Sequence, residues 1–294
     1  MRRLAKLIPR QARSWLRSPG RSLNWLTDEA LYRLGTDVSL DVSPGLALRC
    51  HPLAYRVAYK PVMDDPEQQR ELTGFLRLCR KDMVLFDIGA HFGIFSIAAA
   101  RKAGPGARIV AVDPSPVAAR MLRIQTSLNE VSEQIEIVEA CVGDTVGEKQ
   151  MIAAGVIGIG YYVEPTTGHT DAEMSRIRQV TLASLASDRA VRPTHVKVDV
   201  ESLEEDVLRG GAAIFESDNK PLLFLELHNQ MMLDGGRDPA GPLDLLERFG
   251  YRLFDHSGHT KLSRTFISSQ PLIRVIARPS GARPSGPEPA DGRT

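Results

Sequence analysis

Residues 84–93, VLFDIGAHFG, decide the fold, because they predict a buried strand that turns directly into a helix. The apolar run at 84–88 is typical of a buried strand, and residues 92–102 have helical character. Gly89 permits a tight turn after the strand, and Gly93 lets the helix start close to the strand and to a ligand. The stretch therefore predicts the first strand–turn–helix unit of an α/β domain.

The same alternation of strand and helix continues along the chain. We predict strands at 108–113, 135–142, 195–200 and 222–227, helices at 116–129, 203–209 and 243–249, and closing strands at 251–254 and 266–269. Such alternation implies a mostly parallel sheet with helices on both faces. We therefore predict a Rossmann-like α/β fold with a mostly parallel seven-stranded sheet, whose ligands bind at the carboxyl ends of the strands.

We divide the chain into four parts: a basic N-terminal arm (1–27), a β-rich segment and helix that lead into the core (28–80), the Rossmann-like domain (81–276) and a disordered tail (277–294). In the second part, residues 36–62 are expected to be β-rich and residues 66–80 helical. Within the domain, residues 148–182 are expected to form a β-rich excursion. No motif can be read in 36–66 or 148–182, where we expect the acceptor-binding parts.

The N-terminal arm is strongly basic. It has no acid before Asp28, and its basic residues are Arg2, Arg3, Lys6, Arg10, Arg13, Arg17 and Arg21. Several apolar residues lie near helical spacing, although Pro9 interrupts a helix there. Two interpretations of the arm stay open. It is either a peripheral contact that rests on an anionic membrane surface, or a leader that is solvated or packed against a partner.

The overall composition excludes several classes of protein. The chain has 294 residues and a formal net charge of +1, so nothing in its charge favours binding to nucleic acid. Cys50, Cys79 and Cys141 form neither a disulfide framework nor a paired metal site. The sequence contains no apolar run long enough to span a membrane and no secretory signal. We therefore expect a cytoplasmic protein in a reducing compartment; its oligomeric state is not indicated.

The first turn and the second strand point to a cofactor. Gly89 and Gly93 follow Asp87 without the G-x-G-x-x-G spacing of a dinucleotide site. An acid there would repel a pyrophosphate but suits an ammonium such as that of S-adenosylmethionine, although a plain turn is the alternative. Asp113 ends the second strand, where a carboxylate can accept both ribose hydroxyls. It could instead cap the helix that follows Pro114.

Charged residues alternate with apolar ones on two later strands. Asp199 and Glu201 share a face of one strand, and Glu226 and His228 share a face of the other. If the strands are neighbours, these four side chains line one cleft, where a carboxylate or imidazole can position a hydroxyl or take its proton. A divalent cation site and a structural ion pair are the alternatives. The pair His256 and His259 is interpreted as part of a polar loop rather than as metal ligands.

Four ordered motifs between about residues 71 and 255 resemble the FkbM family of methyltransferases: residues 86–96, FDIGAHFGIFS; 110–116, VAVDPSP; 196–211, VKVDVESLEEDVLRGG; and 223–228, LFLELH. The resemblance implies a fold of the class I methyltransferase type, S-adenosyl-L-methionine as methyl donor, and O-methylation of a small-molecule or glycan hydroxyl. Under this interpretation the cofactor contacts Asp87, Gly89, Ala90, His91, Gly93, Asp113, Pro114, Ala140 and Cys141, and we assign no metal ligands.

Two positions depart from the pattern of the family. His91 stands where the family usually has Asn, and Ser202 where it usually has Gly. A Ser restricts the backbone at the catalytic edge, which leaves open a changed substrate or lost activity. Two other functions stay open: a non-catalytic cofactor-binding interaction protein and a nucleotide-dependent oxidoreductase. Binding of NAD would distinguish the second of these.

Overall fold

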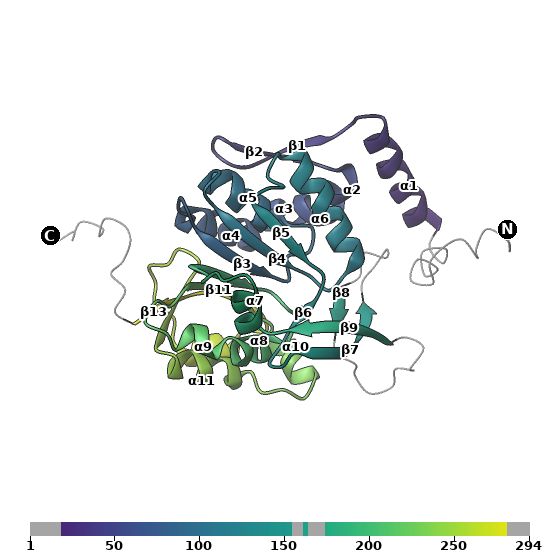
Figure 1. Ribbon diagram of the computed structural model, residues 1–294. Helices are drawn as coiled ribbons and strands as arrows, with labels where there is room; N and C mark the ends of the chain where they lie inside the picture. Colours follow the sequence, from purple (N-terminus) through teal and green to yellow (C-terminus); the bar gives the residue numbers. More distant parts are fainter. Residues whose placement is uncertain (1–18, 155–160, 164–173, 281–294) are drawn as a thin grey trace.

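The computed structural model describes residues 19–154, 161–163 and 174–280. Its centre is a seven-stranded sheet in the order β12-β13-β11-β10-β3-β4-β5 (Figure 1). These strands are β3 Val84–Ile88, β4 Arg108–Val112, β5 Ile135–Val138, β10 His195–Val198, β11 Leu222–Leu227, β12 Tyr251–Phe254 and β13 Ile273–Pro279. Only β13 runs antiparallel to its neighbours in this sheet. The predicted fold class is confirmed.

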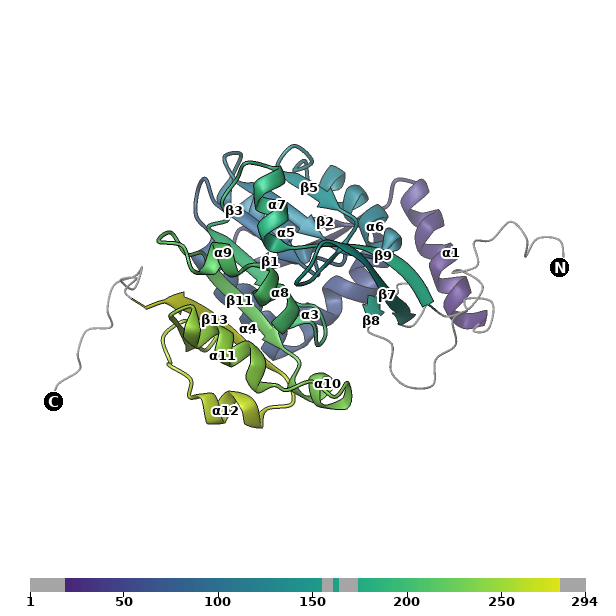
Figure 2. The same ribbon diagram turned by 60° about the horizontal axis from the view of Figure 1, so that its bottom comes forward.

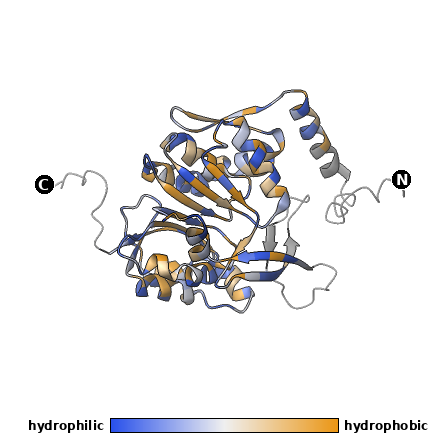
Figure 3. Ribbon diagram, in the orientation of Figure 1, coloured by the Kyte–Doolittle hydropathy of each residue, from blue (hydrophilic) through white to orange (hydrophobic). Residues whose placement is uncertain are grey.

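Helices cover both faces of the sheet. One face packs against α4 Pro66–Leu78, α5 Ile94–Ala103 and α6 Pro116–Leu128. The other packs against α7 Leu182–Asp188, α8 Glu204–Gly210, α9 Ala212–Phe215 and α11 Ala240–Arg248. Successive residues of β3 divide between the two cores, with Leu85 on one side and Phe86 on the other. The central strands are accordingly apolar along most of their length (Figure 3), as strands buried on both faces must be.

The segment before the core is only partly β. Strands β1 Val38–Ser43 and β2 Leu46–Cys50 lie within the segment predicted to be β-rich and pair with each other. Residues 52–64 are instead helical, in α2 Pro52–Ala54, the π-helical turn η3 Tyr55–Tyr59 and α3 Lys60–Asp64. The helix α1 Pro19–Arg33 precedes them. The buried hydroxyl of Tyr59 donates to the Phe92 carbonyl oxygen at 2.7 Å. This contact ties the segment to the turn after β3.

The predicted β-rich excursion forms a second sheet beside the first. Its strands are β6 Cys141–Val142, β7 Gly147–Ala154, β8 Tyr161–Val163 and β9 Met174–Val180, in the order β6-β9-β7-β8. The predicted strand 135–142 is therefore two strands, since β5 pairs with β4 and β6 pairs with β9. Residues 155–160 and 164–173 of this predicted excursion lie outside the described residues.

The predictions near the C-terminus are wrong in two places. Residues 266–269 lie in a helix, α12 Arg264–Ser269, because the Ser263 hydroxyl caps its first turn by accepting from the Phe266 amide. The closing strand is β13, which continues through Ala277 to Pro279 (Figure 2). Ala277 is fully buried in the sheet, so the start of the predicted disordered tail belongs to the core. The rest of that tail, from residue 281, is not described.

One short helix, α10 Asn229–Asp234, completes the described elements. This helix begins directly after β11, so that strand leads straight into a turn at the carboxyl edge of the sheet. No helix within the described residues combines the length and the apolar character that crossing a bilayer requires. Cys50, Cys79 and Cys141 are all free thiols.

Candidate active site

A cavity of about 240 Å³ opens at the carboxyl ends of β3, β4 and β10, where the fold places ligands. The predicted cofactor residues Gly89, His91, Asp113, Pro114, Ala140 and Cys141 line it. Asp199 and Glu201 face the same cavity from the end of β10. Residues that the sequence scatters over more than a hundred positions therefore meet at one edge of the sheet.

The turn after β3 is shaped by Gly89. Its φ is +81°, and a Cβ atom there would lie 1.8 Å from the backbone oxygen of Asp199. The amides of Gly89 and Ala90 both donate to the Val112 carbonyl, at 2.9 and 3.0 Å. This glycine thus allows β3, β4 and β10 to approach one another closely at the mouth of the cavity.

His91 follows in the same turn with a φ of +49°, a conformation that favours Asn or Gly over most residues. Its ring stacks on Phe92 with the ring centroids 4.2 Å apart. Burial lowers the pKa of His91 to about 4, so the imidazole is neutral near pH 7. A neutral ring can still form hydrogen bonds to a ligand in the cavity.

Asp113 is held by two backbone amides. Its Oδ2 accepts from the His91 amide at 2.9 Å, and its Oδ1 accepts from the Ser115 amide at 2.8 Å. Burial raises its pKa to about 6. The N-cap of α6 is Ser115, not Asp113, so the capping alternative is wrong. Each carboxylate oxygen keeps capacity for a further hydrogen bond from the cavity.

Asp87 lies in a second cavity of about 240 Å³ that adjoins the first. The two cavities share Gly89, His91 and Asp199, and Ala90 and Gly93 line only the second. The Ser96 hydroxyl donates to Asp87 Oδ2 at 2.5 Å. Burial raises the pKa of Asp87 above its usual range. The predicted cofactor residues therefore fall into two adjoining compartments with Asp199 between them.

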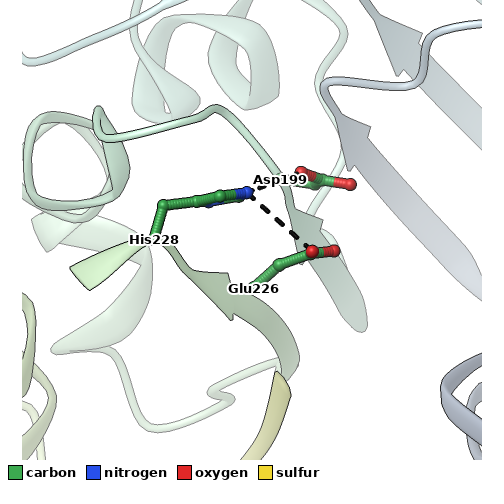
Figure 4. Close-up of side chains that lie close together, drawn as sticks. All are labelled: Asp199, Glu226 and His228. Atoms are coloured by element: carbon green, nitrogen blue, oxygen red, sulfur yellow. Dashed lines mark ion pairs between the residues drawn. The ribbon is translucent and has the colours of Figure 1, made fainter. Parts of the chain in front are cut away.

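Three of the four predicted catalytic side chains come together (Figure 4). One ligand-type atom from each of Asp199, Glu226 and His228 lies within 4.8 Å of the others. His228 Nε2 is 3.8 Å from Asp199 Oδ1 and 3.8 Å from Glu226 Oε1. Because β10 pairs with β11, Asp199, Glu226 and His228 meet at one edge of the sheet. The four predicted side chains do not line a single cleft, since Glu201 lines the first cavity and Glu226 the second.

Glu201 takes a different position. It has a φ of +50° and lines the first cavity. Burial, with Asp199 nearby, raises its pKa to about 7. The next residue, Ser202, has a φ of +88°, which is the left-handed region that favours glycine. The serine at this position, where the family usually has glycine, therefore carries backbone strain.

The cluster also contacts charged residues outside the predicted site, namely Lys197, Glu71 and Arg274. Lys197 Nζ lies 3.1 Å from Asp199 Oδ2 and 3.8 Å from Glu71 Oε1. Arg274 donates to Glu71 and to Glu226. Glu71 comes from α4 and Arg274 from β13, so residues that are far apart in the sequence hold this part of the site.

The charges of the cluster differ from member to member. Burial would raise the pKa of Asp199, but the Lys197 ammonium and the His228 imidazolium outweigh it, and the pKa is lowered. Burial, with the Asp199 and Glu71 carboxylates, raises the pKa of Glu226 to about 8. Asp199 is therefore the carboxylate that remains charged over the widest range of pH.

His228 is the cation that faces these acids. Burial would lower its pKa, but the hydrogen bond and charge of Glu204 outweigh it and raise the pKa to about 9. His228 Nδ1 lies 2.7 Å from Glu204 Oε1, and Glu204 is fully buried. A protonated imidazole cannot accept a proton, so a raised pKa makes His228 a weaker candidate than Asp199 for a general base.

A divalent cation is disfavoured at this cluster by its charges. Lys197 and Arg274 already pair with the two carboxylates, and a cation would have to displace the proton of His228. His256 and His259 lie apart from the cluster, in the loop after β12, where His256 Nε2 is 3.9 Å from Glu67 Oε2.

Replacing Glu204 tests the charge of His228. We expect Glu204→Gln to lower the pKa of His228 by about 1–3 units, because an opposite charge in contact is lost. In the wild type the pKa is raised from 6.5 to about 9, so this pair stabilises the fold below pH 6.5 and the stabilisation is lost as the pH rises through 9. Titration of the imidazole by NMR measures both values. A wild-type pKa near 6.5 would contradict the assignment.

The strand order, with its single antiparallel strand next to one edge and its cavity at the carboxyl ends, is that of a class I methyltransferase. Residues 87–253, more than half of the chain, match the family model described as "Methyltransferase FkbM domain". The chain belongs to the FkbM methyltransferase family. Membership of this family implies S-adenosyl-L-methionine as the methyl donor.

Comparison with individual proteins gives weaker similarities. The chain is 32% identical over 79 residues to the ribosomal protein L11 methyltransferase of Desulfitobacterium hafniense (strain DSM 10664 / DCB-2), and this match covers 26% of the chain and 24% of that protein. The chain thus spans about a quarter of the length of the curated relative that it matches.

Two solved structures are similar over most of their length. The ribosomal protein L11 methylase from Lactobacillus delbrueckii subsp. bulgaricus is 13% identical, with a TM-score of 0.45 over 82% of this chain and 98% of that chain. An O-methyltransferase from Bacillus cereus in complex with SAH is 11% identical, with a TM-score of 0.40 over 77% of this chain and 96% of that chain.

Proposed function

We propose that the chain transfers a methyl group from S-adenosyl-L-methionine to a hydroxyl of a sugar, a glycolipid or a secondary metabolite. The observation that carries the proposal is the position of Asp199, which lies between the cavity of Asp113 and the cavity of Asp87. A carboxylate at that junction lies where a methyl donor bound along both cavities would meet an acceptor.

The residues of the first cavity fit the adenosyl half of the donor. Asp113 offers two carboxylate oxygens to ribose hydroxyls, and Val112, Val142 and Met151 provide apolar walls for a flat base. In the second cavity, Asp87 lies among buried acids that suit the positive charge of the methionine end. The bound donor supplies an electrophilic methyl group on a sulfonium.

Residues of the chain position the acceptor and remove its proton. Asp199 accepts a hydrogen bond from the acceptor hydroxyl and takes its proton as the oxygen–carbon bond forms and the sulfur–carbon bond breaks. The pair of His228 and Glu204 positions Asp199 and Glu226 from the other side. Much of the rate acceleration would come from holding donor and acceptor in line.

Asp113→Ala tests the ribose assignment. We expect it to weaken the binding of S-adenosylhomocysteine at least tenfold, because about two charge-assisted hydrogen bonds are lost. Calorimetric titration measures the change. Asp113→Asn, which keeps an acceptor oxygen, should lose less; equal affinity of the wild type and the alanine variant would contradict the role.

A methyl-transfer assay tests the reaction. The purified protein is incubated with methyl-labelled donor and a panel of neutral glycosides, a glycolipid and matched amines. We expect label on an acceptor oxygen, identified by mass spectrometry and NMR. Transfer only to nitrogen would contradict O-methylation. Donor binding without transfer to any member of the panel would favour a cofactor-binding interaction protein, which the strain at Ser202 makes a real alternative.

A further inference from the structure

The helix α1 has its acidic side turned toward the body of the protein. Asp28 is 8% exposed, and its Oδ2 accepts a hydrogen bond from Arg56 Nε at 2.9 Å. Glu29 Oε2 lies 3.7 Å from His51 Nε2, and Glu29 Oε1 lies 3.6 Å from Arg120. Ion pairs, rather than an apolar stripe, therefore attach this part of the helix to the domain.

The apolar side of the same helix faces outward. Leu26 is 56% exposed, Leu31 is 39% exposed, and Leu34, directly after the helix, is 82% exposed. Ala30 is also exposed, and the exposed positions from Leu26 to Leu34 include no acid. An ordinary surface helix has the opposite arrangement, with its apolar side buried. Figures 1 and 2 both show α1 at the periphery of the molecule.

Basic side chains border this apolar face. The side chain of Arg33 is 73% exposed and that of Arg120 is 64% exposed, and both reach Glu29 beneath the helix. In the sequence, six basic residues in positions 1–18 precede α1, and there is no acid before Asp28. An outward apolar face among cations, without an exposed acid, is complementary to anionic lipid headgroups.

We propose that α1, through Leu26, Leu31 and Leu34 with the bordering Arg33 and Arg120, docks on the surface of an anionic bilayer. The helix would lie in the plane of the interface with its leucines among the acyl chains. A second copy of the chain is a poorer partner, because pairing two such faces would bring two strongly basic segments together. This docking surface is independent of the proposed reaction.

Co-sedimentation with vesicles tests the docking surface. The full chain is mixed with vesicles of pure phosphatidylcholine, or with vesicles that contain about 30% phosphatidylglycerol, a fraction that gives a clearly negative surface potential. We expect binding to the anionic vesicles only, weakened by high salt. The double variant Leu31→Glu, Leu34→Glu should bind at least tenfold more weakly, because two inserted side chains become charged.

Leu233→Glu is the matched control, since Leu233 is 57% exposed on α10, away from α1. It should bind like the wild type, and all variants should keep the wild-type Tm. Absence of wild-type binding to anionic vesicles, or unchanged binding of the double variant, would overturn the proposal. A wild-type dimer that the double variant dissociates, without vesicle binding, would assign the face to a second copy and also overturn it.

Discussion

Asp199→Asn should abolish methyl transfer while the binding of S-adenosylhomocysteine largely survives. The substitution keeps the shape of the side chain but removes the charge that accepts the hydroxyl proton, and a positioned base contributes about 10²–10⁴-fold in rate. Asp199 is the acid of the cluster whose pKa is lowered, so it is charged near neutral pH. The rate is measured with the acceptor that the methyl-transfer assay identifies.

Two controls make this result interpretable. Asp218→Asn, at an exposed position, should leave the rate unchanged. Glu204→Gln should lower the rate less than Asp199→Asn does, and should change its pH dependence, because Glu204 acts through His228. A rate for Asp199→Asn equal to that of the wild type would contradict the role of Asp199, whatever the outcome for cofactor binding.

Gly89→Ala should abolish cofactor binding and strongly destabilise the fold. An added Cβ would lie 1.8 Å from the backbone oxygen of Asp199, and this backbone atom cannot move without separating β3 from β10. The positive φ adds about 1–2 kcal/mol of strain. We expect a loss of several kcal/mol in the free energy of unfolding, on the scale of an overpacked core, and loss of measurable binding of S-adenosylhomocysteine.

Gly35→Ala separates the two causes. Gly35, directly after α1, has a φ of +83°, close to the +81° of Gly89, but a Cβ added there would meet nothing within 4 Å. It should show only the cost of the backbone conformation and bind the cofactor like the wild type. Equal losses in the two variants would contradict a specific role for the close approach of Gly89 to Asp199.

The sheet and the cofactor turn could be predicted because their signals are local. The strands β3, β4, β10 and β11 are buried runs bounded by turn residues. In this kind of fold, ligands bind at the turns that follow the carboxyl ends of the strands. The alternating charges at the carboxyl ends of β10 and β11 predicted that Asp199 lies near Glu226 and His228, because parallel neighbouring strands end at the same edge of a sheet.

The rest of the site depends on tertiary contacts that have no local pattern. Glu71 interrupts the apolar side of α4, and Glu204 starts a helix; their partners are 126 and 24 positions away, at Lys197 and His228. Arg274 lies in β13, a strand that the sequence pattern does not indicate. Short apolar segments such as 266–269 form a strand or a helix according to capping and packing, and here the Ser263 cap favours the helix.

The most direct test of the central claim is calorimetric titration of the full chain with S-adenosylhomocysteine and, separately, with NAD. The proposal predicts saturable one-site binding of S-adenosylhomocysteine, weakened at least tenfold by Asp113→Ala, and no binding of NAD. Binding of NAD alone would contradict it and point to the oxidoreductase. Binding of neither ligand would mean that the cavity of Asp113 does not hold an adenosyl cofactor.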